Sequence, residues 1–218
     1  MFKIDWKIVR DIYSVGLPGI IMQSIGSFMH LGFNAIIAAN ATAVTILGIY
    51  FKLQSFIFLP VFGLNQGAMP IMGYNYGARN KARLMQTYRY ALAAAVVIMS
   101  IGLAVFQLKP DLLLKLFSAD EEMYTIGIPA LRMISLCFLP AAYGIICSTT
   151  FQSTGHGMYS LFSSLIRQLV GILPIAYFLY NHYGVMWCWA AFPLAELLGT
   201  TYVTIMFIYL YRTEIRNL

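Results

Sequence analysis

The longest stretch without a charged residue is the feature that most limits how this chain can fold. From Ile12 to Phe51 the sequence contains no aspartate, glutamate, lysine or arginine. One helix crosses a bilayer core with about 20 apolar residues, so this stretch is about twice as long as a single span requires. The residues Asn40-Ala41-Thr42 interrupt it. The stretch therefore predicts two membrane-spanning helices joined by a turn.

The composition excludes an ordinary soluble protein. Apolar residues make up 60% of the 218 residues and charged residues 10%, whereas soluble domains are about 45–50% apolar and about 25% charged. A single soluble core of this size cannot enclose so much apolar surface. Solidly apolar runs such as 91–101 favour helices over barrel strands, which alternate every second residue. We therefore expect an all-α, polytopic membrane bundle.

The apolar windows and their breaks predict six transmembrane helices in one lobe over residues 1–218. They span residues 12–38, 42–75, 89–108, 125–151, 158–180 and 185–210. The amphipathic stretch from Leu112 to Phe117 is too short to span and is expected to lie on the membrane surface.

Basic residues are unequally divided between the two sides of this arrangement. With six spans, one side carries both termini and nine basic residues: Lys3, Lys7, Arg10, Arg79, Lys81, Arg83, Arg89, Arg212 and Arg216. The other side carries Lys109, Lys115 and the acidic run 120–122. Since cytoplasmic loops are enriched in lysine and arginine, both termini are expected in the cytoplasm of a cell with this protein in its plasma membrane. The net charge of +6 is explained in this way, and no basic face remains for nucleic acid.

Four charged residues fall inside the expected spans: Lys52, Arg132, Arg167 and Glu196. Each costs about 2.5–3.5 kcal/mol near the bilayer centre, so such residues line a cavity or pair with each other. The helical rise places Lys52, Arg167 and Glu196 near one depth and Arg132 nearer the surface.

Two interpretations of these charges remain open. One is a buried Lys52–Glu196 or Arg167–Glu196 pair that locks the bundle. The other is a polar cavity in which Glu196 binds a proton or a cation. Because three basic residues face one acid, the lobe by itself is a poor site for a cationic substrate. Acidic groups from another lobe or chain are expected to face it.

A polar face on the first span is the second candidate lining of such a cavity. Gln23, Ser27, His30 and Asn34 are spaced four, three and four residues apart and share one helical face. Hydrogen bonding between helices is the alternative role of this face. No second histidine or cysteine lies at ligand spacing from His30, so no metal site is predicted.

The end of the second span is interrupted by helix breakers. Pro60, Gly63, Gly67 and Pro70 lie within a short distance of each other. Such residues bend or unwind a helix, and in transporters interrupted spans mark binding sites and hinges. We treat these four residues as hinge candidates, with a static packing kink as the alternative.

The sequence Pro-Ile-Met-Gly-Tyr-Asn-Tyr-Gly-Ala-Arg at 70–79 resembles the segment that closes the second span of each lobe in the multidrug and toxic compound extrusion (MATE) family. Gly16-Leu17-Pro18 resembles the start of that family's C-terminal lobe. Phe-Gln-Ser-Thr-Gly at 151–155 resembles the loop after the fourth span. The resemblance covers residues 3–212.

The resemblance implies more than the spacing does. Family members have two six-helix lobes related by an axis along the membrane normal, and they export organic cations and other drugs in exchange for Na⁺ or H⁺ by alternating access. This chain resembles the C-terminal lobe alone, so its implied partners are the missing N-terminal lobe or a second six-helix lobe, a drug substrate and lipid. Some members carry acids on the first and fourth spans of this lobe. Here span one has Gln23 and Asn34 instead, and span four has no acid.

Two functions other than a half-transporter are compatible with the sequence. A flippase for lipid-linked saccharides suits an interior rich in Lys52, Arg132 and Arg167, which match an anionic pyrophosphate. A membrane fragment without transport activity is a third possibility. An enzyme is not expected, because no HExxH or GxSxG motif is present and Glu196 is the single carboxylate in the expected spans. No cofactor is expected beyond the coupling ion.

Overall fold

The fold was analysed in a computed structural model. It describes the backbone of residues 6–218 and, within that range, every side chain except those of residues 8, 11, 12, 14–19, 22 and 23. The described chain is helical, with no strands, as predicted for an all-α bundle. The long helices are α1 (Trp6–Ile37), α2 (Ala41–Gly77), α3 (Lys81–Leu108), α5 (Glu121–Ser135), α6 (Phe138–Ser153) and α10 (Ala191–Thr213). Shorter elements are α4 (Pro110–Lys115), α7 (Gly157–Leu165), η1 (Ile166–Ile172), α8 (Leu173–Tyr183), α9 (Val185–Cys188) and η2 (Ile215–Asn217).

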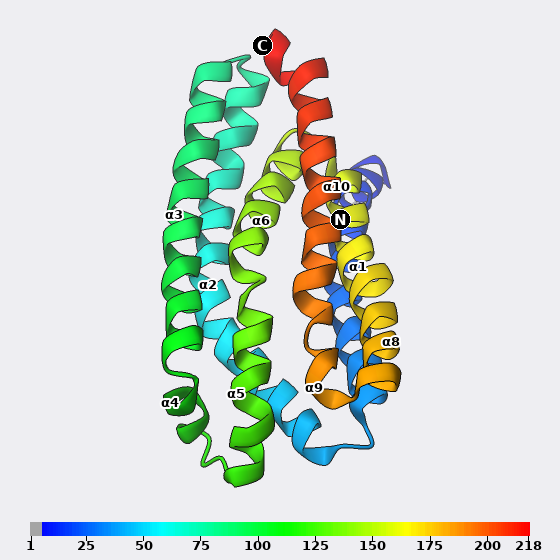
Figure 1. The fold of residues 1–218 in the computed structure, drawn as a ribbon. Coiled ribbons are helices and arrows are strands. Elements are labelled where there is room, and N and C mark those ends of the chain that lie inside the picture. The colour runs from blue at the N-terminus through cyan, green and yellow to red at the C-terminus, as the bar shows by residue number, and fades with distance from the viewer. Residues whose placement is uncertain (1–5) are drawn as a thin grey trace, which may run out of the picture.

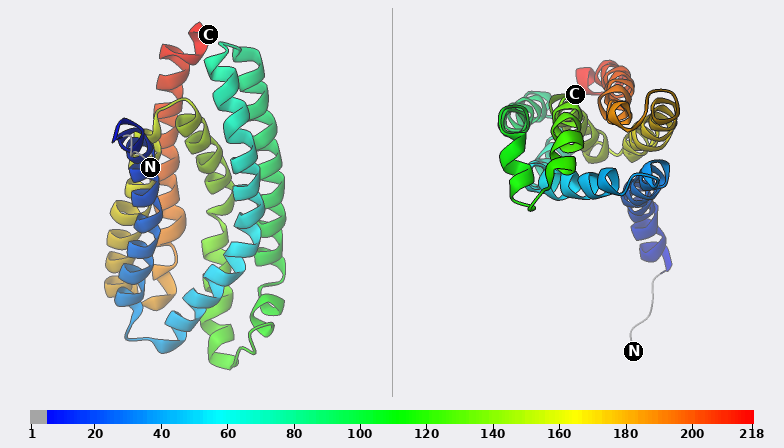
Figure 2. Two further views of the ribbon diagram at one scale, coloured as in Figure 1. Left: turned by 180° about the vertical axis from the view of Figure 1, so that it is seen from behind. Right: turned by 60° about the horizontal axis from the view of Figure 1, so that its bottom comes forward.

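The helices form two groups that stand side by side (Figure 1). α2, α3 and α6 pack against one another in the first group, and α1, α10 and the continuous α7–η1–α8 rod pack together in the second. α6 joins the groups through its contacts with α7 and α10. α2 begins below the second group and crosses obliquely before it rises beside α3 (Figure 2). The interior therefore lies between two walls of helices.

Polar caps explain where several helices begin. The side chain of Asn40 accepts a hydrogen bond of 2.8 Å from the backbone N–H of Ala43, and Asn80 accepts one of 3.1 Å from Arg83. Asp120 accepts a bond of 2.8 Å from the N–H of Met123 at the start of α5. These caps satisfy backbone donors that a helix start otherwise leaves unpaired. The first of them sits at the predicted turn between spans one and two.

Prolines break one predicted rod and make a second one irregular. The predicted span 125–151 consists of α5 and α6, which meet at an angle of 43°. Pro140 provides no N–H for the carbonyl of Leu136, and the break lies at that residue. Likewise Pro174 provides none for Val170, which lies in the π-helical segment η1. Both irregularities lie beside the interior.

Four described helical rods have the length and apolar composition of a membrane span, and the bent α5–α6 pair makes five if it is taken as one span. In α1 the fully described part is the apolar stretch Ser24–Ile37, so whether this helix spans the membrane lies outside the described residues. The count of six spans therefore stays a prediction. The stretch predicted to lie on the surface forms the short helix α4.

One end of the molecule gathers the basic segments together. The α2–α3 turn and the C-terminus lie at this end, and α4 lies at the opposite one (Figure 1). The carboxylate of Glu214 connects three segments here. It lies 3.0 Å from Nε2 of His156 in the α6–α7 turn and accepts a hydrogen bond from the hydroxyl of Tyr76 in α2. The segment 70–79 and the turn that follows segment 151–155, two of the three segments that resemble the family, are thus joined to the end of α10.

Candidate functional site

A cavity of about 540 Å³ lies between the two helix groups. Residues of α1, α2, α6, α7, η1 and α10 line it, with Cys137 from the α5–α6 break. The polar side chains in its lining are His30, Gln54, Asn65, Gln66, Ser148, Gln152, Ser163, Ser164, Arg167, Gln168 and Glu196. The aromatic ones are Tyr50, Phe51, Phe58, Phe62 and Phe192. The lining is thus partly hydrogen-bonding and partly aromatic.

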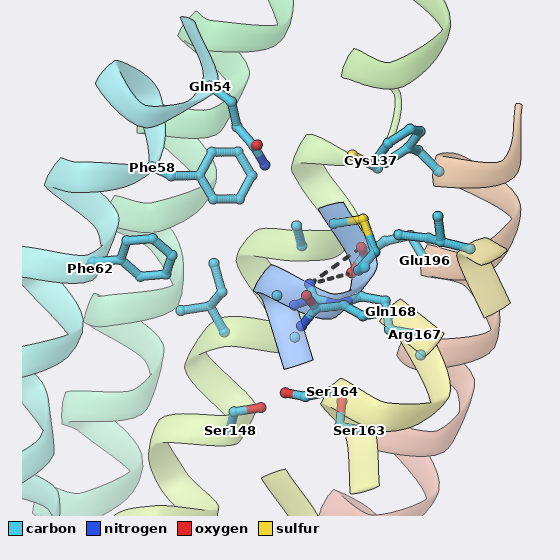
Figure 3. Close-up of a pocket in the computed structure, with 18 of the residues that line it drawn as sticks. Gln54, Phe58, Phe62, Cys137, Ser148, Ser163, Ser164, Arg167, Gln168 and Glu196 are labelled. Carbon is cyan, nitrogen blue, oxygen red and sulfur yellow. Dashed lines mark hydrogen bonds and ion pairs between the residues drawn. The ribbon is translucent and has the colours of Figure 1, made fainter. Parts of the chain in front are cut away.

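An ion pair between Arg167 of η1 and Glu196 of α10 lies in this cavity (Figure 3). The guanidinium Nη1 is 3.4 Å from each carboxylate oxygen of Glu196. The two partners are unequally enclosed, since 8% of the Glu196 side chain is exposed and 27% of Arg167. A buried carboxylate is costly in a medium of low dielectric constant unless a cation compensates it, and Arg167 provides that compensation.

Gly199 makes room for the pair, and two further glycines face the polar groups at ordinary contact distance. A Cβ at Gly199 would lie 3.2 Å from the Cβ of Arg167, and one at Gly144 would lie 3.8 Å from Oε1 of Glu196. A Cβ at Gly26 would lie 3.5 Å from Oε1 of Gln168. Three helices thus approach the polar groups with bare backbone, which the sequence analysis did not detect.

Rings on α2 face the polar groups across the cavity. Phe58 and Phe62 project from α2 on one side of the close-up, with Arg167, Gln168 and Glu196 opposite them (Figure 3). The centroids of the two rings are 6.1 Å apart. Towards α1 the His30 ring lies 3.6 Å, centroid to centroid, from that of Phe51. The arrangement offers one surface for stacking and one for hydrogen bonding.

The structure brings together only part of the predicted polar set. His30, Arg167 and Glu196 line the cavity, and of the two predicted pairs Arg167–Glu196 is the one present. Asn34 donates a hydrogen bond of 2.9 Å to the carbonyl of His30 in its own helix, and Ser27 is exposed. Gln23 lies outside the residues whose side chains the structure describes.

Lys52 corrects the expectation that it lines the cavity with Arg167 and Glu196. Its side chain is exposed, and its Nζ lies 5.9 Å from the centroid of the Phe117 ring, beyond α4. The reason is the direction in which the side chain leaves α2, which residue counting does not give. Arg132 is also exposed. Two of the three basic residues that favoured a pyrophosphate-binding flippase therefore lie outside the cavity.

The hinge candidates lie on a continuous helix. α2 includes both Pro60 and Pro70 and remains helical from residue 41 to residue 77, so the helix bends without unwinding. Gly63 and Gly67 are exposed, and a Cβ at either would meet no atom within 4 Å. The role of these four residues as a hinge stays a prediction.

Sequence reasoning missed most of the lining. Gln168, Ser163 and Ser164 lie beside or near Arg167 in a predicted span, and their polarity within an apolar run is a signal that was not used. Asn65 and Gln66 lie between the hinge candidates and also reach the cavity. Its aromatic residues carry no comparable signal, because rings are common throughout the sequence. Among the described residues, no group of three or more histidine, cysteine or acidic side chains is placed to hold a metal.

Long apolar helices around a partly polar cavity define a class of protein, the polytopic helical membrane proteins with an internal binding site. Residues 18–178 match the family described as MatE. Since the match covers more than half of the chain, this protein belongs to the MatE family of multidrug transporters. The resemblance found in the sequence motifs is thereby confirmed. Membership also agrees, at the level of the family, with the expectation that the chain is no enzyme.

The relatives and solved structures agree with this assignment. The chain is 24% identical over 178 residues to the multidrug export protein MepA of Staphylococcus haemolyticus (strain JCSC1435), and 26% identical over 196 residues to MepA of Staphylococcus aureus (strain MW2). It resembles the outward-facing and inward-facing conformations of a multidrug resistance MATE transporter of the MOP superfamily. The TM-scores are 0.83 and 0.80, at 25% identity over 97% of this chain.

The chain spans about half the length of the proteins that it matches. The alignments cover 81% and 85% of this chain but 39% and 42% of the two MepA proteins. They cover 49% and 51% of the two transporter structures.

Proposed function

We propose that the chain is the C-terminal lobe of a secondary-active multidrug exporter, which moves organic cations and other drugs out of the cell in exchange for H⁺ or Na⁺ by alternating access. One observation carries this proposal: a partly aromatic, partly polar cavity with an ion pair lies in a chain of the MatE family that spans half of its relatives. Aromatic surface combined with hydrogen-bonding groups suits drug-sized ligands.

A second lobe completes the proposed transporter. Arg167 and Glu196 cancel each other's formal charge within the cavity, so this lobe offers no free carboxylate to an organic cation. The other lobe, or a second chain, would supply acidic groups and the opposite wall. The excess of lysine and arginine at the end with the α2–α3 turn and the C-terminus supports a cytoplasmic position for this end in the plasma membrane.

Co-expression tests the proposal. The chain, its complementary lobe and both together are expressed in cells that lack their own drug exporters, and ethidium accumulation is followed by fluorescence. We expect both lobes together to lower accumulation and each lobe alone to leave it unchanged, because alternating access requires two lobes that move against each other. Recovery of the two lobes in one complex from detergent shows that they assemble.

Two results would contradict a half-transporter. One is ethidium export by the chain alone. The other is an assembled, membrane-inserted pair of lobes that leaves accumulation unchanged. The same cells identify the coupling ion. If H⁺ drives export, an uncoupler that collapses the proton gradient is expected to abolish it; if Na⁺ drives export, omission of Na⁺ is expected to do so.

A further inference from the structure

The accessible member of the ion pair determines what a ligand in the cavity meets first. The Arg167 side chain is 27% exposed and the Glu196 side chain 8%. A cation that enters the cavity therefore meets the guanidinium before the carboxylate, and like charges repel. A ligand that carries a hydrogen-bond acceptor instead meets the N–H donors of the Arg167 guanidinium.

The guanidinium retains donors for such a ligand. Both contacts to Glu196 are made by the single nitrogen Nη1, at 3.4 Å. A tight arginine–carboxylate pair has shorter bonds, of about 2.7–2.9 Å, and commonly uses two nitrogens in parallel. Because a guanidinium carries five N–H groups, this loose contact does not exhaust its capacity.

Neutral hydrogen-bonding groups surround the same place. Gln168 follows Arg167 in η1, and Ser148, Ser163 and Ser164 lie together near it in the cavity (Figure 3). Hydroxyl and amide groups donate hydrogen bonds without adding negative charge. Among the lining residues within the described chain, Glu196 is the one acid, and Arg167 already occupies it.

We propose that Arg167 binds the hydrogen-bond-accepting end of the substrate, with a carboxylate as the strongest acceptor, while the Phe58 and Phe62 side of the cavity takes its aromatic body. Glu196 is then a positioning residue, which holds the guanidinium in the cavity. This inference rests on the proposed function and names the substrate chemistry that this lobe recognises. A cationic group on the same substrate faces the other lobe.

Three probes with one ring system test this inference: pyrenebutyrate, pyrenebutanol and pyrenebutylamine. Binding to the full chain in lipid nanodiscs is measured by energy transfer from tryptophan to pyrene, with empty nanodiscs as background. We expect pyrenebutyrate to bind about tenfold or more tightly than pyrenebutylamine, as one charge-assisted hydrogen bond provides, with pyrenebutanol between them.

Three variants test whether the Arg167–Glu196 pair causes the preference for the carboxylate probe. Arg167→Gln is expected to abolish the advantage of the carboxylate. Glu196→Gln is expected to widen it, because the amide oxygen still accepts a hydrogen bond that holds the guanidinium, while the negative charge that competes with the ligand is gone. This variant leaves no buried carboxylate unpaired and serves if Arg167→Gln does not fold. Lys52→Gln is the matched control, since it removes an equal charge from outside the cavity and is expected to keep the wild-type order.

The outcomes separate this inference from the proposed function. Tighter binding of the amine to the wild type, an unchanged order in Arg167→Gln, or no widening in Glu196→Gln overturns the role of Arg167. If the expected order is found but the assembled lobes do not export ethidium, the proposed transport fails while the acceptor site stands.

Discussion

Replacing Arg167 by leucine is expected to lower the free energy of unfolding by about 3–5 kcal/mol, because the Glu196 carboxylate is then buried without its counterion. Such a loss is large compared with the marginal stability of most folded proteins. Unfolding of the purified chain in detergent micelles, followed by circular dichroism during a denaturant titration, measures the change.

A double variant separates the lost pair from lost packing. Arg167→Leu combined with Glu196→Leu removes both charges, and a buried pair replaced by apolar residues often costs little. We expect the double variant to be more stable than Arg167→Leu alone, which gives a favourable coupling energy in the double-mutant cycle. Lys52→Leu is the control for a lost surface charge, with an expected change of about 1 kcal/mol or less. A double variant as unstable as the single one would refute the coupling.

Substitution of Gly171 by alanine is expected to destabilise the protein by about 1–3 kcal/mol, as overpacking of a tight interior does. A Cβ at this position would lie 2.7 Å from the Cβ of Ala195 and 2.9 Å from the carbonyl oxygen of Ile166. The Ile166 oxygen belongs to the backbone of η1 itself, so relief requires η1 to change its own path, and relief of the Ala195 contact requires η1 to move away from α10. Arg167 lies on that segment and Glu196 follows Ala195, so the ion pair would shift as well.

Gly48→Ala is the matched control for this substitution. Gly48 also lies within a helix, α2, but a Cβ there meets no atom within 4 Å. Alanine is favoured over glycine in a helix by about 0.5–1 kcal/mol, so this variant is expected to be stabilised. The two changes should therefore shift the unfolding midpoint in opposite directions. Equal shifts would show that η1 and α10 do not pack as closely as described.

The overall fold class could be predicted from sequence because it depends on runs of apolar residues. The stretch from residue 12 to residue 51 requires two helices, and the turn at Asn40 follows from a residue that caps helices well. The effect of each proline could not be predicted in this way. Pro60 and Pro70 are accommodated inside α2, whereas Pro140 lies just after a break. Tertiary packing determines whether a proline bends or breaks a helix, and this packing cannot be inferred from the local sequence pattern.

The candidate site could be predicted only in part. Arg167 and Glu196 are conspicuous because charge is rare in these spans, but the sequence left two possible partners for Glu196. Lys52 was expected in the cavity but lies outside it, because the direction in which a side chain leaves its helix does not follow from residue counting. The glycines around the pair could not be predicted either, because their position beside it depends on how three helices pack together.

Water access to the cavity is the most direct test of the whole account, since both substrate binding and the role of Arg167 depend on it. Cys137, Cys147 and Cys188, which are free and buried, are replaced by alanine, and one cysteine is introduced at Ser164 in the cavity or at Val97, which is 60% exposed on α3. A charged, membrane-impermeant maleimide is then applied to the protein in nanodiscs. We predict that the cysteine at position 164 is labelled and the one at position 97, which faces lipid, is not. Labelling at 97 with none at 164 would contradict a water-filled site inside a membrane bundle.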